Sequence, residues 1–359
     1  MIESQNVGAL NRASPQVEAR RYRGAILLIA GLGIIVTSAI AATFGSVAIP
    51  LETLARIVVA KMPGASIAMT WSPSWETILF DIRLPRILLA ALVGGALATS
   101  GATYQGLLRN PLADPYLIGI SSGAALGATV AIIFNIDIWG ALPLFAFFGA
   151  MGATLAIYLI AQTGGHTTPT TLILAGVALG AFLSAITSFL MFRGDSAFQT
   201  HRVIAWVLGS LALSNWNQAF LLLPYLGVGW LVLYLHARYL NVLQLGETQA
   251  QQLGVPVERV TLTVIIATSM VTAAAVAVSG LIGFVGLIVP HVVRLIWGPD
   301  HRFLLPMSAM IGAIFLIIAD TLARTLLSPT ELPVGIITAF CGAPFFLYLL
   351  RRKSHVFAV

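Results

Sequence analysis

Residues 83–123, RLPRILLAALVGGALATSGATYQGLLRNPLADPYLIGISSG, contain an apolar, glycine-rich segment long enough to cross a bilayer. Two arginines precede this segment. Pro111 and Pro115 interrupt the chain after it, before a second apolar segment begins. Charged ends, small residues in the middle and a turn rich in proline are typical of a transmembrane helix with functional residues at both ends. The stretch therefore predicts a membrane protein.

The composition extends this prediction to the whole chain. Of its 359 residues, 58% are hydrophobic and 9% are charged, whereas an average soluble domain has about 25% charged residues. The net charge of +6 is spread singly or in small groups between apolar runs, which indicates membrane topology and excludes a nucleic-acid-binding patch. The single cysteine, Cys341, excludes an intrachain disulfide and a cysteine-rich metal site. We predict an all-α, polytopic protein in a lipid bilayer.

About ten transmembrane helices are expected. The apolar segments are 24–44, 86–107, 116–134, 139–161, 170–192, 218–236, 260–280, 281–297, 303–326 and 333–350. They predict one membrane domain over residues 24–350, between a cytoplasmic segment 1–23 and a cytoplasmic tail 351–359. The first run is longer than a signal-peptide core, so it is expected to remain as a span. With both termini inside, twelve Lys and Arg residues lie inside and seven outside, as membrane topology favours.

Two parts of this pattern are irregular. The eighth segment is expected to be short or broken, because Pro290, His291 and Arg294 leave little apolar length. The outer connection 194–217 contains the apolar run 203–213, whose eleven residues are too few to cross a bilayer. We expect a short helix there that lies in the interface or lines a cavity.

A stripe of small residues, Gly94, Ala98, Ala102 and Gly106, recurs every four positions along the second segment. Small residues at this spacing let helix backbones approach closely within a membrane. Simple helix packing is the favoured interpretation, and the alternative is a span near the centre of the assembly.

Three arginines, Arg83, Arg86 and Arg324, are expected on the outer side. Arginine at the end of a span usually reaches towards lipid headgroups, and Asp320, one turn before Arg324, allows a local ion pair. The residues alone favour these two interpretations over the third, in which the positive groups dock an acidic partner.

The inner loop Asn241–Glu258 has its own compact pattern. Gly246 interrupts it, residues 247–253 favour a short helix, and Gly254 and Pro256 end that helix. We expect two short helices with a glycine corner. A contact surface for a partner and a helix that rests on the membrane remain equally compatible with this pattern.

Several function classes lack their sequence signatures. The only lysines, Lys61 and Lys353, follow no glycine pattern of a P-loop, so the chain does not bind ATP through such a loop. No predicted span has an acidic residue near its centre, which argues against an ion-coupled secondary transporter. No metal-ligand cluster and no pair of nucleophile and base stands out, so neither a metal site nor catalytic residues are predicted.

A series of longer motifs in the chain resembles the motifs of a known protein family. RLPR, SGATYQGLLRNPLADPYLIGISSGAALG, LILAGVALGAFLSAI, LGETQAQQLGV, SGLIGFVGLIVPHVVRL, DHR, ADTLAR and ELPVGIITAFCGAPFF occur in this order over nearly the whole chain beyond the first span. Together they resemble the permease subunits of type II ABC importers, which carry ferric siderophores, haem and cobalamin.

The resemblance implies a homodimer of ten-span subunits with two cytoplasmic ATPase subunits and a periplasmic binding protein. ATP and Mg²⁺ would be used by the ATPase, and the permease would hold no cofactor. Arg83, Arg86 and Arg324 match the arginines that dock the binding protein. The loop 241–258 matches the coupling helices that contact the ATPase, with Leu245, Gly246, Glu247, Ala250, Leu253 and Gly254. A cytoplasmic gate matches Asn110, Pro111, Leu112, Pro169 and Thr170. Pro169 and the bulky Tyr104 and Tyr116 depart from the family pattern there.

The expected function is import across the bacterial inner membrane by alternating access of the two subunits. The apolar spans favour haem or another iron chelate as cargo. Cobalamin and ferric siderophores are alternatives within the same family, and an ion-coupled secondary transporter is the alternative from another class.

Overall fold

The computed structural model describes residues 15–63, 68–136, 138, 140–162, 167–194 and 196–353. The regular secondary structure of these described residues is helical throughout, as the composition predicts. The elements are α1 (Pro15–Thr43), α2 (Leu51–Ala60), α3 (Pro73–Thr77), the π-helix η1 (Ile78–Arg83), α4 (Leu84–Leu107), the 3₁₀ turn η2 (Pro115–Ile118), α5 (Ile120–Ile133), α6 (Ala141–Ala161), α7 (Pro169–Arg193), α8 (Ala197–Val207), α9 (Trp216–Leu243), α10 (Glu247–Gln252), α11 (Val257–Ser279), α12 (Val285–Trp297), α13 (His301–Thr325) and α14 (Val334–Lys353).

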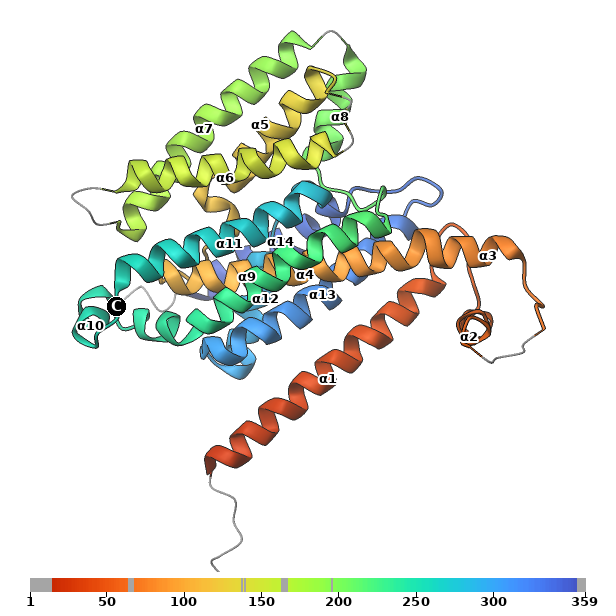
Figure 1. The fold of residues 1–359 in the computed structure, drawn as a ribbon, viewed down its shortest axis with the longest axis horizontal. Helices are drawn as coiled ribbons and strands as arrows, with labels where there is room; N and C mark the ends of the chain where they lie inside the picture. Colours follow the sequence, from red (N-terminus) through yellow and green to blue (C-terminus); the bar gives the residue numbers. More distant parts are fainter. Residues whose placement is uncertain are drawn as a thin grey trace, which may run out of the picture.

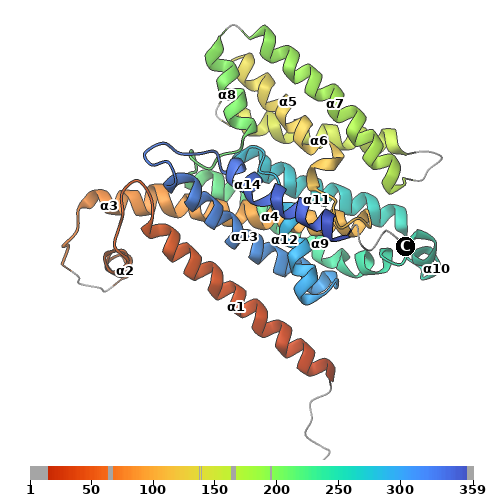
Figure 2. The same cartoon turned by 180° about the vertical axis from the view of Figure 1, so that it is seen from behind.

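Helix α4 is the centre of the bundle. Nearly all of its residues are buried, because α9, α11, α12 and α13 pack around it (Figures 1 and 2). Helices α5, α6, α7 and α8 form a second group above this core in Figure 1, and α6 joins it to α11. Helix α1 crosses the other side of the core and packs mainly on α13.

The small-residue stripe lies where α4 meets α13. A Cβ built on Gly94 would lie 2.2 Å from the carbonyl oxygen of Gly312, and a Cβ on Gly312 would lie 2.4 Å from that of Gly94. Ala98 and Ala102 are fully buried, and a Cβ on Gly106 would lie 2.3 Å from Nε2 of His301. The stripe thus lets the two helix backbones approach closely at Gly94 and Gly312 and makes room for the His301 ring at Gly106.

Six helical segments have the length and apolar composition to cross a membrane: Tyr22–Thr43 in α1, and α6, α7, α9, α11 and α13. Three shorter apolar segments are Ile120–Ile133, Val285–Trp297 and Val334–Tyr348. Helix α4 is about 36 Å long at 1.5 Å per residue, which exceeds the hydrocarbon core of about 30 Å. The chain is a multi-pass membrane protein, and the count of ten spans stays a prediction.

Backbone turns explain most differences from the predicted boundaries. The third predicted segment is divided by Gly119, whose φ of 72° separates η2 from α5. The eighth is short, as expected, because α12 begins only at Val285, after Gly280 and Phe284 with φ of 68° and 69°. Helix α1 begins at Pro15, so the segment 1–23 that we predicted to precede the first span is partly helical.

The short outer helix differs in position from the prediction. It is α8, Ala197–Val207, rather than a helix within 203–213. Ser196 begins it by accepting a hydrogen bond from the Gln199 amide, and Gly209, with φ of 71°, follows its end. The apolar residues after Val207 are therefore outside the helix.

Candidate functional site

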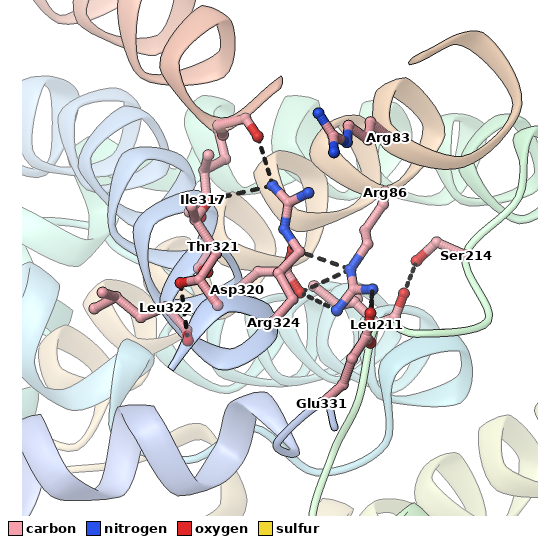
Figure 3. A network of polar contacts seen from close by, with 12 residues as sticks. Arg83, Arg86, Leu211, Ser214, Ile317, Asp320, Thr321, Leu322, Arg324 and Glu331 are labelled. Carbon is pink, nitrogen blue, oxygen red and sulfur yellow. Dashed lines mark hydrogen bonds and ion pairs between the residues drawn. The ribbon is translucent and has the colours of Figure 1, made fainter. Parts of the chain in front are cut away.

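The three arginines predicted on the outer side lie together in the structure. Arg83 ends η1, Arg86 lies in the first turn of α4, and Arg324 lies in the last turn of α13. Arg86 and Arg324 form a network with the carboxylates of Asp320 and Glu331, and Arg83 lies beside this network; these five residues are here called the arginine cluster (Figure 3). The cluster lies at the end of the bundle that carries α3, and α10 lies at the opposite end (Figure 1).

A π-helical segment positions the first of these arginines. Pro85 has no amide hydrogen to donate to the carbonyl of Asp81, and its ring excludes an ordinary α-helical turn before it. The chain forms η1 instead, and the amide of Leu84 donates to the carbonyl five residues earlier, that of Leu79. The wider turn directs Arg83 into the protein, where it is 3% exposed.

Arg83 and Arg324 both bind the carboxy-terminal end of α1. Nη1 of Arg83 donates to the carbonyl of Ala42 at 2.6 Å, and its Nη2 donates to the carbonyl of Val47. Nη2 of Arg324 donates to the carbonyl of Ala41 at 2.7 Å. The last carbonyls of a helix lack intrahelical partners and carry partial negative charge, so two guanidinium groups stabilise this end.

Arg86 bridges two carboxylates. Its Nε donates to both carboxylate oxygens of Asp320 at 3.0 Å, and its Nη2 lies 2.9 Å from Oδ1 of the same residue. Its Nη1 lies 2.9 Å from Oε2 of Glu331. The Asp320 side chain is 2% exposed, whereas that of Glu331 is 40% exposed. The cluster therefore has a buried side and an open side.

The residues predicted to dock a partner are buried, which limits the access of a partner to them. Arg86 and Arg324 are each 5% exposed, and the local pair between Asp320 and Arg324 is present, with 3.5 Å between Oδ2 and Nε. Arg86 pairs with both carboxylates and Arg324 pairs with Asp320, whereas Arg83 donates to backbone carbonyls. Docking of an acidic partner stays a prediction, and it requires access from the Glu331 side.

The predicted coupling loop contains one short helix rather than two. Helix α9 continues to Leu243, so the first of the expected pair is the end of a long helix. Gly246, with φ of 110°, turns the chain into α10, and Gly254, with φ of 80°, follows it. Ala250 is buried, whereas Leu245 and Leu253 on either side of α10 are 58% and 64% exposed. The two exposed leucines thus flank the short helix and offer apolar side chains to a partner.

The end of α9 that leads into α10 is bonded to both central helices. Nε2 of Gln244 donates to the carbonyl of Gly106 at 2.9 Å, at the end of α4. Nδ2 of Asn241 donates to Oδ1 of Asp300 at 2.8 Å, and Oδ1 of Asn241 accepts from the amide of His301 at 2.9 Å. These contacts fix the base of α10 to α4 and to the start of α13.

Asp300 also fixes α1 at this end. Nη1 of Arg23 lies 2.7 Å from Oδ2 of Asp300, and the Arg23 guanidinium lies 5.5 Å from the centre of the Phe303 ring. Partial burial acts to raise the pKa of Asp300, but the hydrogen bonds from Arg23 and Asn241 outweigh it and hold the pKa below its ordinary value. Asp300 is therefore ionised at neutral pH.

The predicted gate residues belong to two facing segments. Asn110 closes a turn after α4, in which its Oδ1 accepts from the amide of Leu112 at 2.9 Å and Pro111 lies between them. Pro169 and Thr170 begin α7, whose first turn Thr168 caps. A narrow cleft is lined by Arg109, Pro169 and Glu247 of α10, among others. The start of α7 and the coupling helix thus share one cleft, and the turn at Asn110 follows Arg109 directly in the chain.

The comparisons with known proteins identify the family of the chain. Residues 33–352 match the model of the FecCD transport family. The chain belongs to this family. The permease is 51% identical over 280 residues to the cobalamin import system permease of Halobacterium salinarum, with 78% of this chain and 74% of that protein covered. It is 41% identical over 307 residues to the hemin transport system permease of Yersinia pestis, with 81% and 90% covered.

A solved structure is similar as well. It is described as a metal-chelate type ABC transporter in an inward-facing conformation, and it matches with a TM-score of 0.79 and 32% identity over 92% of this chain and 99% of that one. The permease is therefore a transport protein and not an enzyme. The described histidine, cysteine, aspartate and glutamate side chains form no group of three that could hold a metal ion.

Two functional candidates were not singled out from the sequence. Glu331 lies in the ELPVG motif and Asp300 in the DHR motif, but neither had an evident partner. Their partners, Arg86 and Arg23, are 245 and 277 residues away in the chain. Only the fold brings such residues together.

Proposed function

We propose that this permease is the membrane subunit of an importer in the cytoplasmic membrane of a bacterium, with both termini in the cytoplasm. Two identical ten-span subunits would enclose the translocation path, two ATPase subunits would bind at the α10 end, and a solute-binding protein would bind at the arginine cluster. The observation that carries this proposal is the family match over residues 33–352, which includes both ends of the bundle. The segments counted by length and composition, together with α4, are consistent with ten spans.

The α10 end is suited to a protein partner. Leu245 and Leu253 present apolar surface beside α10, and buried apolar contacts dominate stable protein interfaces. Glu247 is held by Arg109 at 3.4 Å and is 38% exposed. ATP and Mg²⁺ would bind to the ATPase partner, and its movement would reach the permease through α10.

The gate would open by alternating access. Pro169 at the start of α7 and Arg109, which precedes the segment Asn110 to Leu112, line one cleft with Glu247 of α10. A displacement of α10 would therefore move both segments. Rocking of the two subunits would then expose the path first to one side of the membrane and then to the other.

We propose a metal chelate as cargo, with haem or another iron chelate first. The apolar character of the spans suits a flat, hydrophobic ring, and the absence of a described metal-ligand group suits a path that does not retain the metal. Cobalamin is the second candidate, because the relative at 51% identity is named for cobalamin import.

The test is uptake by the purified permease in proteoliposomes with its ATPase and the solute-binding protein encoded beside it. We expect uptake of one labelled cargo among haem, cobalamin and a ferric hydroxamate, and only with ATP and both partners present. Uptake by the permease alone, driven by an ion gradient, would instead identify a secondary transporter.

A further inference from the structure

The open side of the arginine cluster depends on one side chain. Glu331 is the exposed member of the cluster, and it contacts Nη1 of Arg86 through both carboxylate oxygens at 2.9 and 3.1 Å. Asp320 holds the other edge of the same guanidinium from inside the protein. Figure 3 shows Glu331 reaching Arg86 from outside the helices that carry the arginines.

Loss of Glu331 would leave one edge of the Arg86 guanidinium without a partner. The Arg86 side chain is 6% exposed and poorly hydrated, so Nη1 would not regain full hydration, although Asp320 would still compensate the charge. Arg83 donates to backbone carbonyls, and Nε of Arg324 is buried 3.5 Å from Oδ2 of Asp320 without a hydrogen-bond partner. Another carboxylate at the same place would restore the contact at little cost.

Glu331 also holds the chain that leads into α14. It lies three residues before Val334, the first residue of that helix, and the amide of Leu332 donates to the carbonyl of Ala323 at 3.0 Å. The connection between α13 and α14 is therefore attached to the bundle at Glu331 and at Leu332.

The first turn of α14 rests on the end of α8. A Cβ on Gly335 would lie 2.2 Å from the carbonyl oxygen of Leu208 and 3.2 Å from that of Leu281. A cavity of about 440 Å³ lies between this part of α14, the end of α8 and residues 281–284. The start of α14 thus has a tight contact on one side and free space beside it.

We propose that Glu331 occupies the place of a partner's carboxylate on Arg86, and that docking exchanges the two. The inference rests on the proposed function, since the partner is the solute-binding protein and the group it supplies is an aspartate or glutamate side chain. When Glu331 is displaced, the connection before α14 loses one of its two attachments and keeps the one at Leu332, and the first turn of α14 can move more readily into the adjacent cavity. Docking is thereby linked to the helices around that cavity.

The test compares Glu331→Gln with the unaltered permease, each assembled with its ATPase in lipid nanodiscs. The substituted amide would keep a hydrogen-bond acceptor for Arg86 but lose the charge that competes with the partner. We expect affinity for the solute-binding protein to increase about 2- to 5-fold at low salt, as expected for loss of one partly exposed ion pair. The matched control is Glu52→Gln, whose carboxylate pairs with Arg56 on exposed α2, and which should leave affinity unchanged.

A second measurement reports the movement directly. Spin labels at Thr330 and at Ser74 on α3, in a Cys341→Ser background, should give a longer or broader distance distribution when the solute-binding protein is added. Unchanged affinity in Glu331→Gln, or an unchanged distance on docking, would overturn the exchange. The same movement on addition of cargo alone would overturn it too, because the carboxylate would then come from the cargo. Absence of any binding to the unaltered permease would overturn both the exchange and the proposed function.

Discussion

Substitution Gly94→Ala tests whether α4 and α13 act as one unit. The new Cβ would lie 2.2 Å from the carbonyl oxygen of Gly312 and 2.7 Å from Cβ of Leu316, whereas ordinary contacts are about 3.5 Å or longer. The obstacle is backbone, so the helices must separate by about 1 Å. Overpacking of this kind costs about 1–3 kcal/mol, and replacing glycine in a helix returns up to about 1 kcal/mol. We expect a net destabilisation of about 1–2 kcal/mol.

The assay is thermal unfolding in detergent, followed by intrinsic tryptophan fluorescence. Gly152→Ala is the matched control, because it is also in a helix and no atom lies within 4 Å of the added Cβ. It should be neutral or slightly stabilising. Equal stability of the two variants would refute the close contact between α4 and α13. A stable Gly94→Ala variant that also binds both partners normally would show that the contact has no role in function.

Three further predictions concern the two ends of the protein. Leu253→Glu, which places a charge beside α10, should weaken co-purification of the ATPase at least tenfold, whereas Leu51→Glu on exposed α2 should have no effect. Arg83→Ala should lower the free energy of unfolding by about 2–4 kcal/mol, because carbonyls such as that of Ala42 lose charged donors; an unchanged melting temperature would contradict this anchoring of α1. Burial raises the pKa of Asp114 to about 6, so the native state binds more protons than the unfolded state and stability should fall as pH rises from about 4 to 6. Asp114→Asn should abolish that fall, which corresponds to about 2–3 kcal/mol of unfolding free energy and is measured as melting temperature against pH.

Hydrophobic periodicity and length were sufficient to predict the class of fold. A run of about 20 apolar residues has few alternatives to a membrane helix, so the long segments agree with α4, α6, α7, α11 and α13 within a few residues, and the first agrees with α1 at its end but not at its start. Shorter elements are set by local backbone chemistry instead. Ser196 and Gly209 determine the limits of α8, and both residues were visible in the sequence beside a stronger apolar run that pointed elsewhere.

In the coupling loop 241–258, the prediction of two short helices failed for a different reason. The residues before Gly246 include neither glycine nor proline from Leu240 onward, so nothing in the sequence separates a short helix from the end of α9. In the structure these residues belong to α9, which continues to Leu243. Asn241 and Gln244, at the end of this helix, bond to α13 and α4. Tertiary contacts, and not local propensity, decide where α9 ends.

The candidate site was predicted in position but not in environment. Topology placed Arg83, Arg86 and Arg324 at one end of the membrane domain, and the structure joins Arg86 and Arg324 through Asp320 with Arg83 beside them. Their burial depends on carbonyls of α1 and on Glu331, which come from distant parts of the chain. Sequence spacing carries no information about such distant pairs, so the residues alone favoured contact with lipid headgroups or the local pair of Arg324 with Asp320, and that pair is present.

The contacts at the two ends of α4 and α13 lead to one mechanical conclusion. These helices carry Arg86 and Asp320 at one end, and at the other their backbone and N-cap bind Gln244 and Asn241 beside α10. Between the ends, the glycine contact leaves no room for one helix to slide past the other without a backbone clash. A partner at the arginine cluster and a partner at α10 would therefore both bind next to the same two helices, α4 and α13. Movement that opens a path must then arise between this pair and the remaining helices, among which α14 and the group α5 to α8 have the loosest attachment to it.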